Sequence, residues 1–291
     1  MEIIYRRQRM CSVSRKLRRE QDQTIGLVPT MGALHDGHLS LVREARRMAD
    51  IVIVSVFVNP TQFAPGEDFE RYPRDLTQDT ALLTDYSVDY IFAPSPDEIY
   101  PKGFATYVTV EGLSDQLEGV ARPGHFRGVA TVVTMLLNLI RPDFAFFGQK
   151  DAQQTLVVKR LVKDLALDAE IVVLPTVRET SGLALSSRNS FLNEEERHAA
   201  AIIYRALTRA ESAYAEGERN GAKIAGIVRA TIETEPRAKL DYVSVTDADT
   251  LERLDKLSDR SILIAAAARF GSTRLIDNIV INRKDGATVK K

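Results

Sequence analysis

The sequence predicts an α/β fold in which a doubly wound, Rossmann-like parallel sheet domain is followed by a smaller α+β C-terminal domain. Short apolar runs alternate with helical patterns from residue 24 to about residue 188, which is typical of a parallel sheet with crossover helices. After residue 188 two helical stretches precede three strand-like runs. A chain of 291 residues is near the size at which a single core splits. We therefore expect domains at residues 1–188 and 189–291.

The first domain is expected to hold five strands that are apolar at nearly every position, because helices cover both faces of a parallel sheet. These strands are predicted at 24–29, 50–58, 89–94, 143–148 and 170–175, and the helices at 39–48, 74–86, 128–140 and 152–165. In the second domain, helices are predicted at about 193–216 and 220–233, and strands at 240–247, 261–270 and 273–282. The short connection at residues 271–272 predicts antiparallel pairing of the last two strands.

Composition and charge restrict the class of partner. The chain is 44% hydrophobic and 27% charged with a net charge of −1, so no overall field attracts nucleic acid or an anionic membrane. Its single cysteine excludes an intrachain disulfide, and no apolar run has the length of a membrane span, so we expect a cytoplasmic protein. The first twenty residues are locally basic. We interpret them as a solvated helix face, and the alternative is a nucleic-acid-binding arm.

The segment PTMGALHDGH, residues 29–38, lies between the first predicted strand and a predicted helix. His35 and His38 are three residues apart, whereas a zinc-binding pair on a helix is usually four apart and has further ligands. His38 falls in the first turn of the helix, where free backbone N–H groups and the helix dipole favour an anion. Gly32 and Gly37 allow a phosphate to approach the backbone. The segment therefore predicts a phosphate clamp and transition-state stabiliser rather than a metal site.

Other polar segments also follow predicted strands, and ligands of open α/β sheets collect at the carboxyl ends of the strands. They include VNPTQF (58–63), FGQKDAQQ (147–154) and GLALSSRN (182–189). Together with RYPR (71–74), EGVARPGHFRGV (118–129) and RLIDN (274–278), they carry a resemblance over residues 24–282. The H-x-G-H at 35–38 is the signature of a nucleotidyltransferase superfamily that includes class I aminoacyl-tRNA synthetases. The whole set resembles the pantoate–β-alanine ligase family.

The resemblance implies an ATP-dependent ligase that joins pantoate and β-alanine to give pantothenate, in coenzyme A biosynthesis. It implies that the pantoate carboxylate attacks the α-phosphorus of Mg-ATP, giving pantoyl adenylate and pyrophosphate, and that β-alanine then displaces AMP. A carboxylate is already ionised at neutral pH, so the first step needs positioning and charge neutralisation rather than a protein nucleophile. The resemblance also implies a homodimer.

Site residues are implied by the same resemblance. Catalytic roles are implied for His35, His38, Lys150 and Arg188, with His38 as proton donor. ATP contacts are implied for Met31, Gly32, His35, Gly37, His38, Gly148, Lys150, Asp151, Val177, Leu185, Ser186, Ser187 and Arg188. Contacts to pantoate or β-alanine are implied for Met31, Asn59, Gln62 and Gln154, and a Mg²⁺ contact for Asp151. Ser186, Ser187 and Arg188 stand where a K-M-S-K-S-type loop stands in synthetases.

Several alternatives stay open. Ser181 stands where the family usually has an aspartate, which leaves the ordering of its loop in doubt. Residues 61–73 are a candidate lid, and the C-terminal domain is a candidate cover for the site. An adenylyltransferase acting on a phosphate acceptor would share the fold, although Gln62 and Gln154 suit such an acceptor less well than arginine or lysine. A non-catalytic nucleotide sensor or RNA-binding module would share it too, although the retained histidines, Lys150 and Arg188 argue against lost chemistry.

Overall fold

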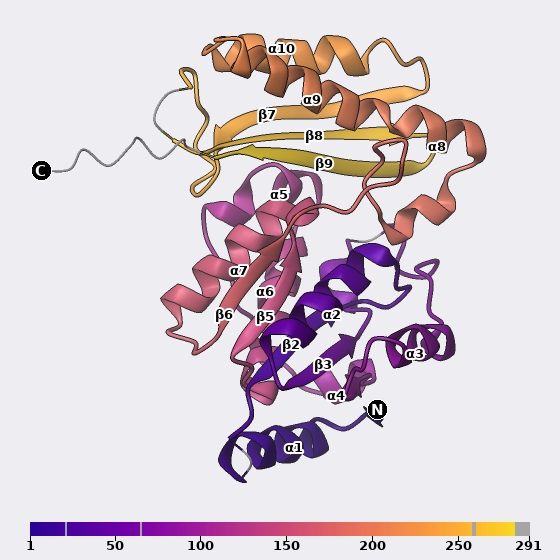
Figure 1. Ribbon diagram of the computed structural model, residues 1–291, viewed down its shortest axis with the longest axis vertical. Helices are drawn as coiled ribbons and strands as arrows, with labels where there is room; N and C mark the ends of the chain where they lie inside the picture. The colour runs from indigo at the N-terminus through magenta and orange to yellow at the C-terminus, as the bar shows by residue number, and fades with distance from the viewer. Residues whose placement is uncertain (21, 65, 258–259, 283–291) are drawn as a thin grey trace, which may run out of the picture. The chain divides into compact units, whose positions relative to one another are not determined.

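The structure is a computed structural model that describes residues 1–20, 22–64, 66–257 and 260–282 (Figure 1). The chain forms two compact units. The first contains residues 1–177 and 185–187, and the second contains residues 178–184 and the chain from residue 188 onward. The chain therefore passes between the units three times, at 177–178, 184–185 and 187–188.

The first unit is built on a six-stranded sheet with the order β1-β4-β3-β2-β5-β6. Its strands are β1 (Glu2–Ile4), β2 (Ile25–Thr30), β3 (Ile51–Val56), β4 (Tyr90–Phe92), β5 (Phe144–Gly148) and β6 (Glu170–Leu174). All neighbouring strands pair in parallel, which confirms the predicted fold class. Strand β1 was not predicted, because three residues are too few to show a strand pattern; it pairs with β4 at the edge of the sheet.

Helices cover both faces of this sheet. They are α1 (Arg7–Glu20), α2 (Asp36–Met48), α3 (Leu76–Thr84), α4 (Pro96–Ile99), α5 (Glu118–Ala121), α6 (His125–Ile140) and α7 (Ala152–Asp164), with short 3-10 turns η1 (Pro60–Gln62), η2 (Leu113–Asp115) and η3 (Gln149–Asp151). Leu27 of β2 packs in one core with α1, α6 and α7. Its neighbour Val28 packs in a second core with α2 and α3. Successive side chains of a strand point to opposite faces, so both must be apolar here.

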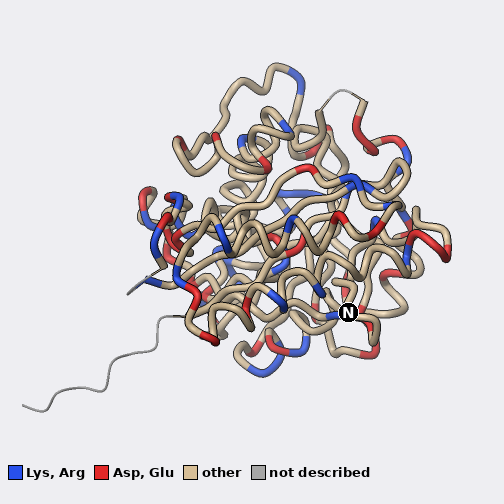
Figure 2. Tube along the Cα trace, turned by 90° about the horizontal axis from the view of Figure 1, so that it is seen from above, with Lys and Arg blue, Asp and Glu red and all other residues tan. Residues whose placement is uncertain are grey.

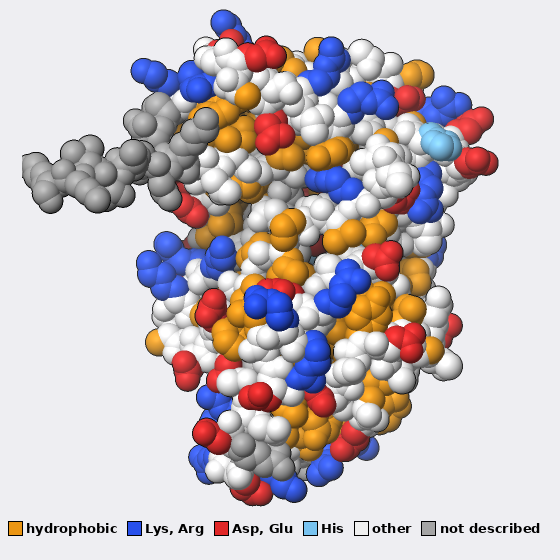
Figure 3. Space-filling view, in the orientation of Figure 1, with side chains coloured by type: hydrophobic (Ala, Val, Ile, Leu, Met, Phe, Trp, Pro, Cys, Tyr) orange, Lys and Arg blue, Asp and Glu red, His pale blue; other side chains and the backbone are white. Residues whose placement is uncertain are grey.

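The basic N-terminal segment forms α1, which buries Met10, Val13 and Leu17. Three arginines in this helix or next to it pair with carboxylates, Arg6 with Glu98 at 3.0 Å, Arg9 with Glu2 at 3.2 Å and Arg18 with Asp143 at 3.4 Å. These contacts support the interpretation of a solvated helix face. Lys and Arg are interspersed with Asp and Glu along the trace and on the visible surface (Figures 2 and 3). Among the described residues, no helix combines the length and apolarity needed to cross a bilayer.

The second unit is an antiparallel sheet of β7 (Ala238–Asp247), β8 (Ile262–Phe270) and β9 (Thr273–Ile281), in that order, as predicted. Helices α9 (Ile202–Ala215) and α10 (Gly221–Ile232) pack on it around Leu207, Ile224 and Ile264 (Figure 1). The helical stretch predicted at 193–216 is divided at Ala201 into α8 (Glu194–Ala200) and α9. Residues 178–184 belong to this unit, although the sequence division at residue 188 assigned them to the first, because Arg178 bonds to Asp277 of β9.

Candidate active site

The strand order places a topological switch point between β2 and β5. From β2 the chain moves outward through β3 and β4, and it then crosses to the other side of β2 to form β5 and β6. Strands β2 and β5 pair through Gly26 with Phe144 and Leu27 with Ala145. The loops that follow these two strands therefore emerge side by side at one edge of the sheet, where ligands of open α/β sheets bind.

The loop after β2 is held in an unusual backbone conformation by a buried carboxylate. Gly32 and Ala33 both have positive φ angles, of 81° and 49°. Asp79 of α3 accepts hydrogen bonds from the backbone N–H of Ala33 at 3.1 Å and of Leu34 at 2.8 Å. Burial raises the pKa of Asp79 above its usual range. Asp79 was missed in the sequence because it lies 46 positions from the loop that it holds, and its only local signal is an acidic residue at a buried helical position.

His35 and His38 stand together at the start of α2. The imidazole of His35 is the N-cap of this helix, and its Nδ1 accepts a hydrogen bond from the Gly37 N–H at 3.2 Å. The two rings lie 4.1 Å apart, centroid to centroid, and are tilted by 33°. The Nδ1 atom of His38 is buried and has no hydrogen-bond partner among the described residues. Both histidines are thus fixed at a helix start, as the sequence predicts.

Burial and a nearby cation keep both imidazoles neutral. Desolvation lowers the pKa of His35 to about 4, and the positive charge of Lys150 contributes to this shift, against the opposing effects of Asp151 and Asp36. Desolvation and then the neighbouring His35 lower the pKa of His38 to about 3. A neutral His35 whose Nδ1 accepts a hydrogen bond carries its proton on Nε2. The ring therefore offers one N–H donor to a ligand rather than a positive charge.

Gly37 leaves the space in which the His35 ring lies. A Cβ atom at position 37 would be 2.8 Å from Cε1 and 2.9 Å from Nδ1 of His35. Any side chain there would displace the imidazole, because real Cβ contacts are longer than this. The glycine between the two histidines is therefore needed for ring position.

The loop after β5 brings charged groups to the same edge. Gly148 ends β5, and Lys150 and Asp151 follow in η3, with Lys150 Nζ 3.7 Å from Asp151 Oδ1. Gln154 is half-buried in the first turn of α7. Its neighbour Gln153 is buried, and its amide bonds to the backbone at Leu113, Gln116 and Glu118. In residues 1–282, apart from the four residues not described, no group of three or more His, Cys, Asp or Glu side chains could hold a metal ion.

Gln62 lies in a separate polar cluster after β3. Its Nε2 contacts Met31 Sδ at 2.9 Å, so the structure brings together two residues for which the resemblance implies pantoate contacts. Its Oε1 accepts a hydrogen bond from Asn59 Nδ2 at 3.0 Å. Asn59 is 1% exposed and uses its amide entirely within the protein, donating also to Gly128 O and accepting from Thr61 and Tyr100. Asn59 therefore orients Gln62.

Two residues of the RPGHFRG motif hold the backbone of Gln62. His125 Nδ1 lies 2.8 Å from Gln62 O, and Arg122 Nη2 donates to the same oxygen at 3.2 Å. Gly128 permits close packing, since a Cβ there would lie 2.4 Å from Thr61 O and 2.6 Å from Gln62 N. Nothing in the sequence beyond the motif itself signals these roles, because the partners are about sixty positions apart.

The candidate lid, residues 61–73, is tied to the same cluster. Arg122 pairs with Glu67 through two hydrogen bonds of 2.8 Å. Phe63 makes edge contacts with Phe69 and Tyr72, with ring centroids 5.3 and 5.9 Å apart. Residue 65 lies outside the described residues. The described part of this segment is thus folded on itself and anchored to Arg122.

Of the remaining predicted site residues, Ser187 contacts the histidine loop within the first unit. Leu185 N–H donates to Val177 O at 3.0 Å, and Ser187 Oγ donates to Ala33 O at 3.2 Å. Ser186 lies between Leu185 and Ser187 in the same segment of the unit, and Arg188, next along the chain, belongs to the second unit. Ser181 Oγ accepts a hydrogen bond from Leu183 N–H at 3.3 Å, so the serine forms the turn that an aspartate forms by the same contact.

A doubly wound sheet with a histidine pair, a lysine and an aspartate at its switch point is an arrangement typical of nucleotide-binding α/β enzymes. The family model for pantoate–β-alanine ligase matches residues 2–280. The chain belongs to the pantoate–β-alanine ligase family.

Individual relatives agree with this assignment. Pantothenate synthetase of Roseiflexus sp. is 57% identical over 258 residues, which cover 89% of this chain and 92% of the relative. The crystal structure of pantothenate synthetase from Thermus thermophilus is 45% identical, with a TM-score of 0.91 over 96% of this chain and 99% of that one. The pantoate–β-alanine ligase of Francisella tularensis, 38% identical with a TM-score of 0.78 over 96% and 97% of the chains, was crystallised with "Beta-gamma ATP" and β-alanine.

Proposed function

We propose that this ligase forms pantothenate from (R)-pantoate and β-alanine in two steps, through a pantoyl adenylate. In the first step a pantoate carboxylate oxygen bonds to the α-phosphorus of ATP, and the bond from that phosphorus to the β-phosphate bridging oxygen breaks, which releases pyrophosphate. In the second step the amine nitrogen of β-alanine bonds to the acyl carbon, AMP leaves, and the nitrogen loses a proton. Family membership and the substrates crystallised with the Francisella enzyme support this reaction.

His35 and His38 act as neutral hydrogen-bond donors to the phosphates of ATP. A neutral ring in a desolvated site keeps its N–H group available without a counter-ion, and such a fixed dipole needs no reorganisation as charge develops. The first turn of α2 adds free backbone N–H groups at the same point. The buried Nδ1 of His38 has no hydrogen-bond partner among the described residues, and we assign His38 the contact nearest to the reacting phosphorus.

Lys150 and the Ser186–Arg188 segment neutralise the departing pyrophosphate. Lys150 is near enough to the histidines for its charge to lower the pKa of both. The hydrogen bond from Ser187 to Ala33 supports a location for the serines beside the histidine loop. Positive charge and hydroxyl donors on a leaving phosphate are the main requirement of this kind of transfer.

Asp151 is the residue that would hold Mg²⁺. Its side chain is 47% exposed and is the one carboxylate of η3. Mg²⁺ is commonly held by one or two carboxylates together with substrate phosphates and water, so the single aspartate fits an ion brought in with ATP. When bound, the ion would supply charge neutralisation at the phosphates.

Gln62, Gln154 and Met31 select pantoate. An amide both donates and accepts, which suits the hydroxyl and carboxylate groups of pantoate, and the thioether of Met31 suits its dimethyl group. Asn59 donates both N–H groups of its amide, to Gln62 Oε1 and to Gly128 O, and its Oδ1 accepts from Thr61 and Tyr100, so we assign Asn59 the positioning of Gln62 rather than a substrate contact. Gly148 and Val177 would meet the adenosine through their backbones.

The observation that carries this proposal is the closely packed, neutral His35–His38 pair beside Lys150 at the switch point. The test is pyrophosphate–ATP exchange with D-pantoate present and β-alanine absent, followed by measurement of AMP and pantothenate after β-alanine is added. We expect exchange that requires pantoate, and AMP equal to pantothenate. H38N should abolish exchange, and H198N, a change to an exposed histidine of α8, should leave it intact.

Two results would contradict the proposal. Absence of exchange with wild-type protein would favour the nucleotide sensor, and transfer of AMP to a phosphate acceptor would favour an adenylyltransferase. A cytoplasmic homodimer, a lid at residues 61–73 and closure by the second unit remain parts of the proposal. Protection of residues 61–73 from protease by ATP plus pantoate is the expected sign of a lid.

A further inference from the structure

Residues 177–185 form a hairpin. Its two end residues belong to the first unit, and the residues between them belong to the second. At the root, Leu185 N–H donates to Val177 O at 3.0 Å. Farther out, Arg178 and Ala184 form an antiparallel bridge, and Glu179 N–H donates to Leu183 O at 2.8 Å. Residues 178–184 are part of the second unit, whereas 177 and 185 are part of the first. The hairpin leads directly into Ser186, Ser187 and Arg188.

A buried ion pair fixes this hairpin to the C-terminal sheet. Arg178 makes a bidentate contact with Asp277 of β9, with Nη1 donating to Oδ2 at 2.5 Å and Nη2 donating to Oδ1 at 2.9 Å. The side chains are 15% and 4% exposed. The same Nη1 donates to Gly182 O at 3.2 Å, and the guanidinium lies 3.7 Å from the centroid of the Tyr204 ring. The pair therefore reaches from β9 to the turn of the hairpin.

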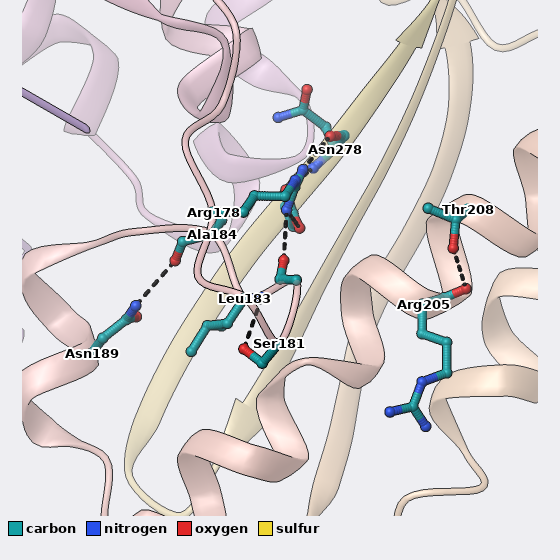
Figure 4. A network of polar contacts seen from close by, with 10 residues as sticks. Arg178, Ser181, Leu183, Ala184, Asn189, Arg205, Thr208 and Asn278 are labelled. Carbon is teal, nitrogen blue, oxygen red and sulfur yellow. Dashed lines mark hydrogen bonds and ion pairs between the residues drawn. The ribbon is translucent and has the colours of Figure 1, made fainter. Parts of the chain in front are cut away.

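A second contact, between Asn189 and Ala184, brackets residues 185–188, which follow the hairpin. Asn189 is 5% exposed, and its Nδ2 donates to Ala184 O at 3.0 Å (Figure 4). Residues 185–188 lie between these two points. The hairpin fixes the start of this short segment, and Asn189 fixes its end, so its conformation depends on groups that do not themselves face a phosphate.

The ion pair is poorly explained as a stabilising contact alone. Burying two charges costs solvation that their attraction often fails to recover, so a buried pair is weak evidence for stability. The pair instead fixes geometry, because a bidentate contact sets the orientation of the guanidinium as well as its distance from the carboxylate. That direction is set toward Gly182 O, in the turn of the hairpin.

We propose that Arg178 and Asp277 are positioning residues for the adenylation step, holding the hairpin so that Ser186, Ser187 and Arg188 meet the departing pyrophosphate. This inference rests on the proposed function. It predicts an asymmetry between the two steps, because pyrophosphate leaves only in the first. Loss of the pair should slow adenylation far more than the attack of β-alanine on an adenylate that is already formed.

The test compares D277N and R178K with wild type and with D241N. The control residue Asp241 of β7 pairs with Arg274 of β9 at 2.7 Å, so D241N removes another ion pair from the same sheet, one whose carboxylate is more exposed than that of Asp277. Three quantities are measured for each protein, namely pantoate-dependent pyrophosphate–ATP exchange, pantothenate formation from synthetic pantoyl adenylate with β-alanine, and the midpoint of thermal unfolding.

We expect D277N to lose exchange by at least about tenfold, since a 1 Å misplacement costs on the order of 100-fold. The second step should stay within about twofold of wild type, as should both steps in D241N, because these changes leave the adenylate-binding groups in place. The exchange rate of R178K should lie between those of D277N and wild type, because lysine keeps the positive charge and loses the bidentate contact. If D277N does not fold, the comparison of R178K with wild type and D241N tests the positioning role.

Equal exchange in D277N and D241N would overturn the inference. So would an equal fall in both steps that follows the unfolding midpoint, because that is the signature of a merely structural pair. If wild type itself shows no exchange, the proposed function fails and this inference fails with it. If wild type exchanges and the variants match it, only the positioning role fails.

Discussion

Substitution of Gly37 by alanine should separate activity from stability. The new methyl group would meet only the ring of His35 at short range, with contacts of 2.8 and 2.9 Å to Cε1 and Nδ1. The ring must withdraw by about 0.6 Å to restore an ordinary contact of 3.4 Å. A side-chain ring can make this movement without any shift of the backbone, so the fold should accept the change.

The two expected effects have different sizes. In stability, alanine gains up to about 1 kcal/mol of helix propensity over glycine, and the weakened cap at His35 costs about 1 kcal/mol. The net change in unfolding free energy should therefore be within about 1 kcal/mol. In activity, a displacement of 1 Å costs on the order of 100-fold, so a shift of about half that size should slow adenylation by about tenfold or more.

The matched control is Gly226→Ala. Gly226 lies inside α10, and a Cβ there has no atom within 4 Å, so the substitution should raise stability by about 1 kcal/mol and leave activity unchanged. Both variants are assayed by urea unfolding and by pantoate-dependent pyrophosphate–ATP exchange. Wild-type exchange in G37A would refute the reasoning, as would a loss of several kcal/mol of stability.

Three further predictions concern groups that support the site. G128A should lose about 1–3 kcal/mol in urea unfolding and raise the KM for pantoate, because its methyl would press on backbone atoms of η1; an unchanged KM would contradict this. D79N should lose about 1–3 kcal/mol and slow exchange, because an amide can accept only one of the two N–H groups; full activity would argue against it. The free energy of unfolding should fall by several kcal/mol as pH drops from about 6.5 toward 4. In the folded protein the pKa values of His35, His38 and His125 are lowered to about 4, 3 and 4, so these side chains bind protons in this pH range only after unfolding. H125N should flatten this pH dependence in thermal melts.

The helices and strands that could be predicted are those whose burial produces a recognisable pattern of apolar residues in the local sequence. Strands β2 and β3 are apolar at successive positions because each buries both faces, and this pattern is visible without a structure. Strand β1 is only three residues long and exists because β4 offers a free edge. The break at Ala201 between α8 and α9 has no glycine or proline to mark it. It depends on packing instead.

The candidate site divides in the same way. His35 and His38 were found because the glycine, the helix start and the spacing lie within ten residues of each other. Asp79 and Gly128 were missed because their partners are 46 and 69 positions away and only folding brings them together. Asn59 was found as a motif residue, but its role depends on which of its atoms are already bonded, and no sequence pattern reports that.

The return of residues 185–187 to the first unit affects how this chain can be divided for expression. A gene fragment beginning at residue 189 would carry Asp277 into the product without Arg178, leaving a buried carboxylate unpaired. A fragment beginning at residue 178 would keep the pair and remove Leu185, Ser186 and Ser187 from the other half. No single cut gives two complete pieces. A fragment that holds either half by itself must join the two separate segments of that half, 1–177 to 185–187 or 178–184 to 188–291.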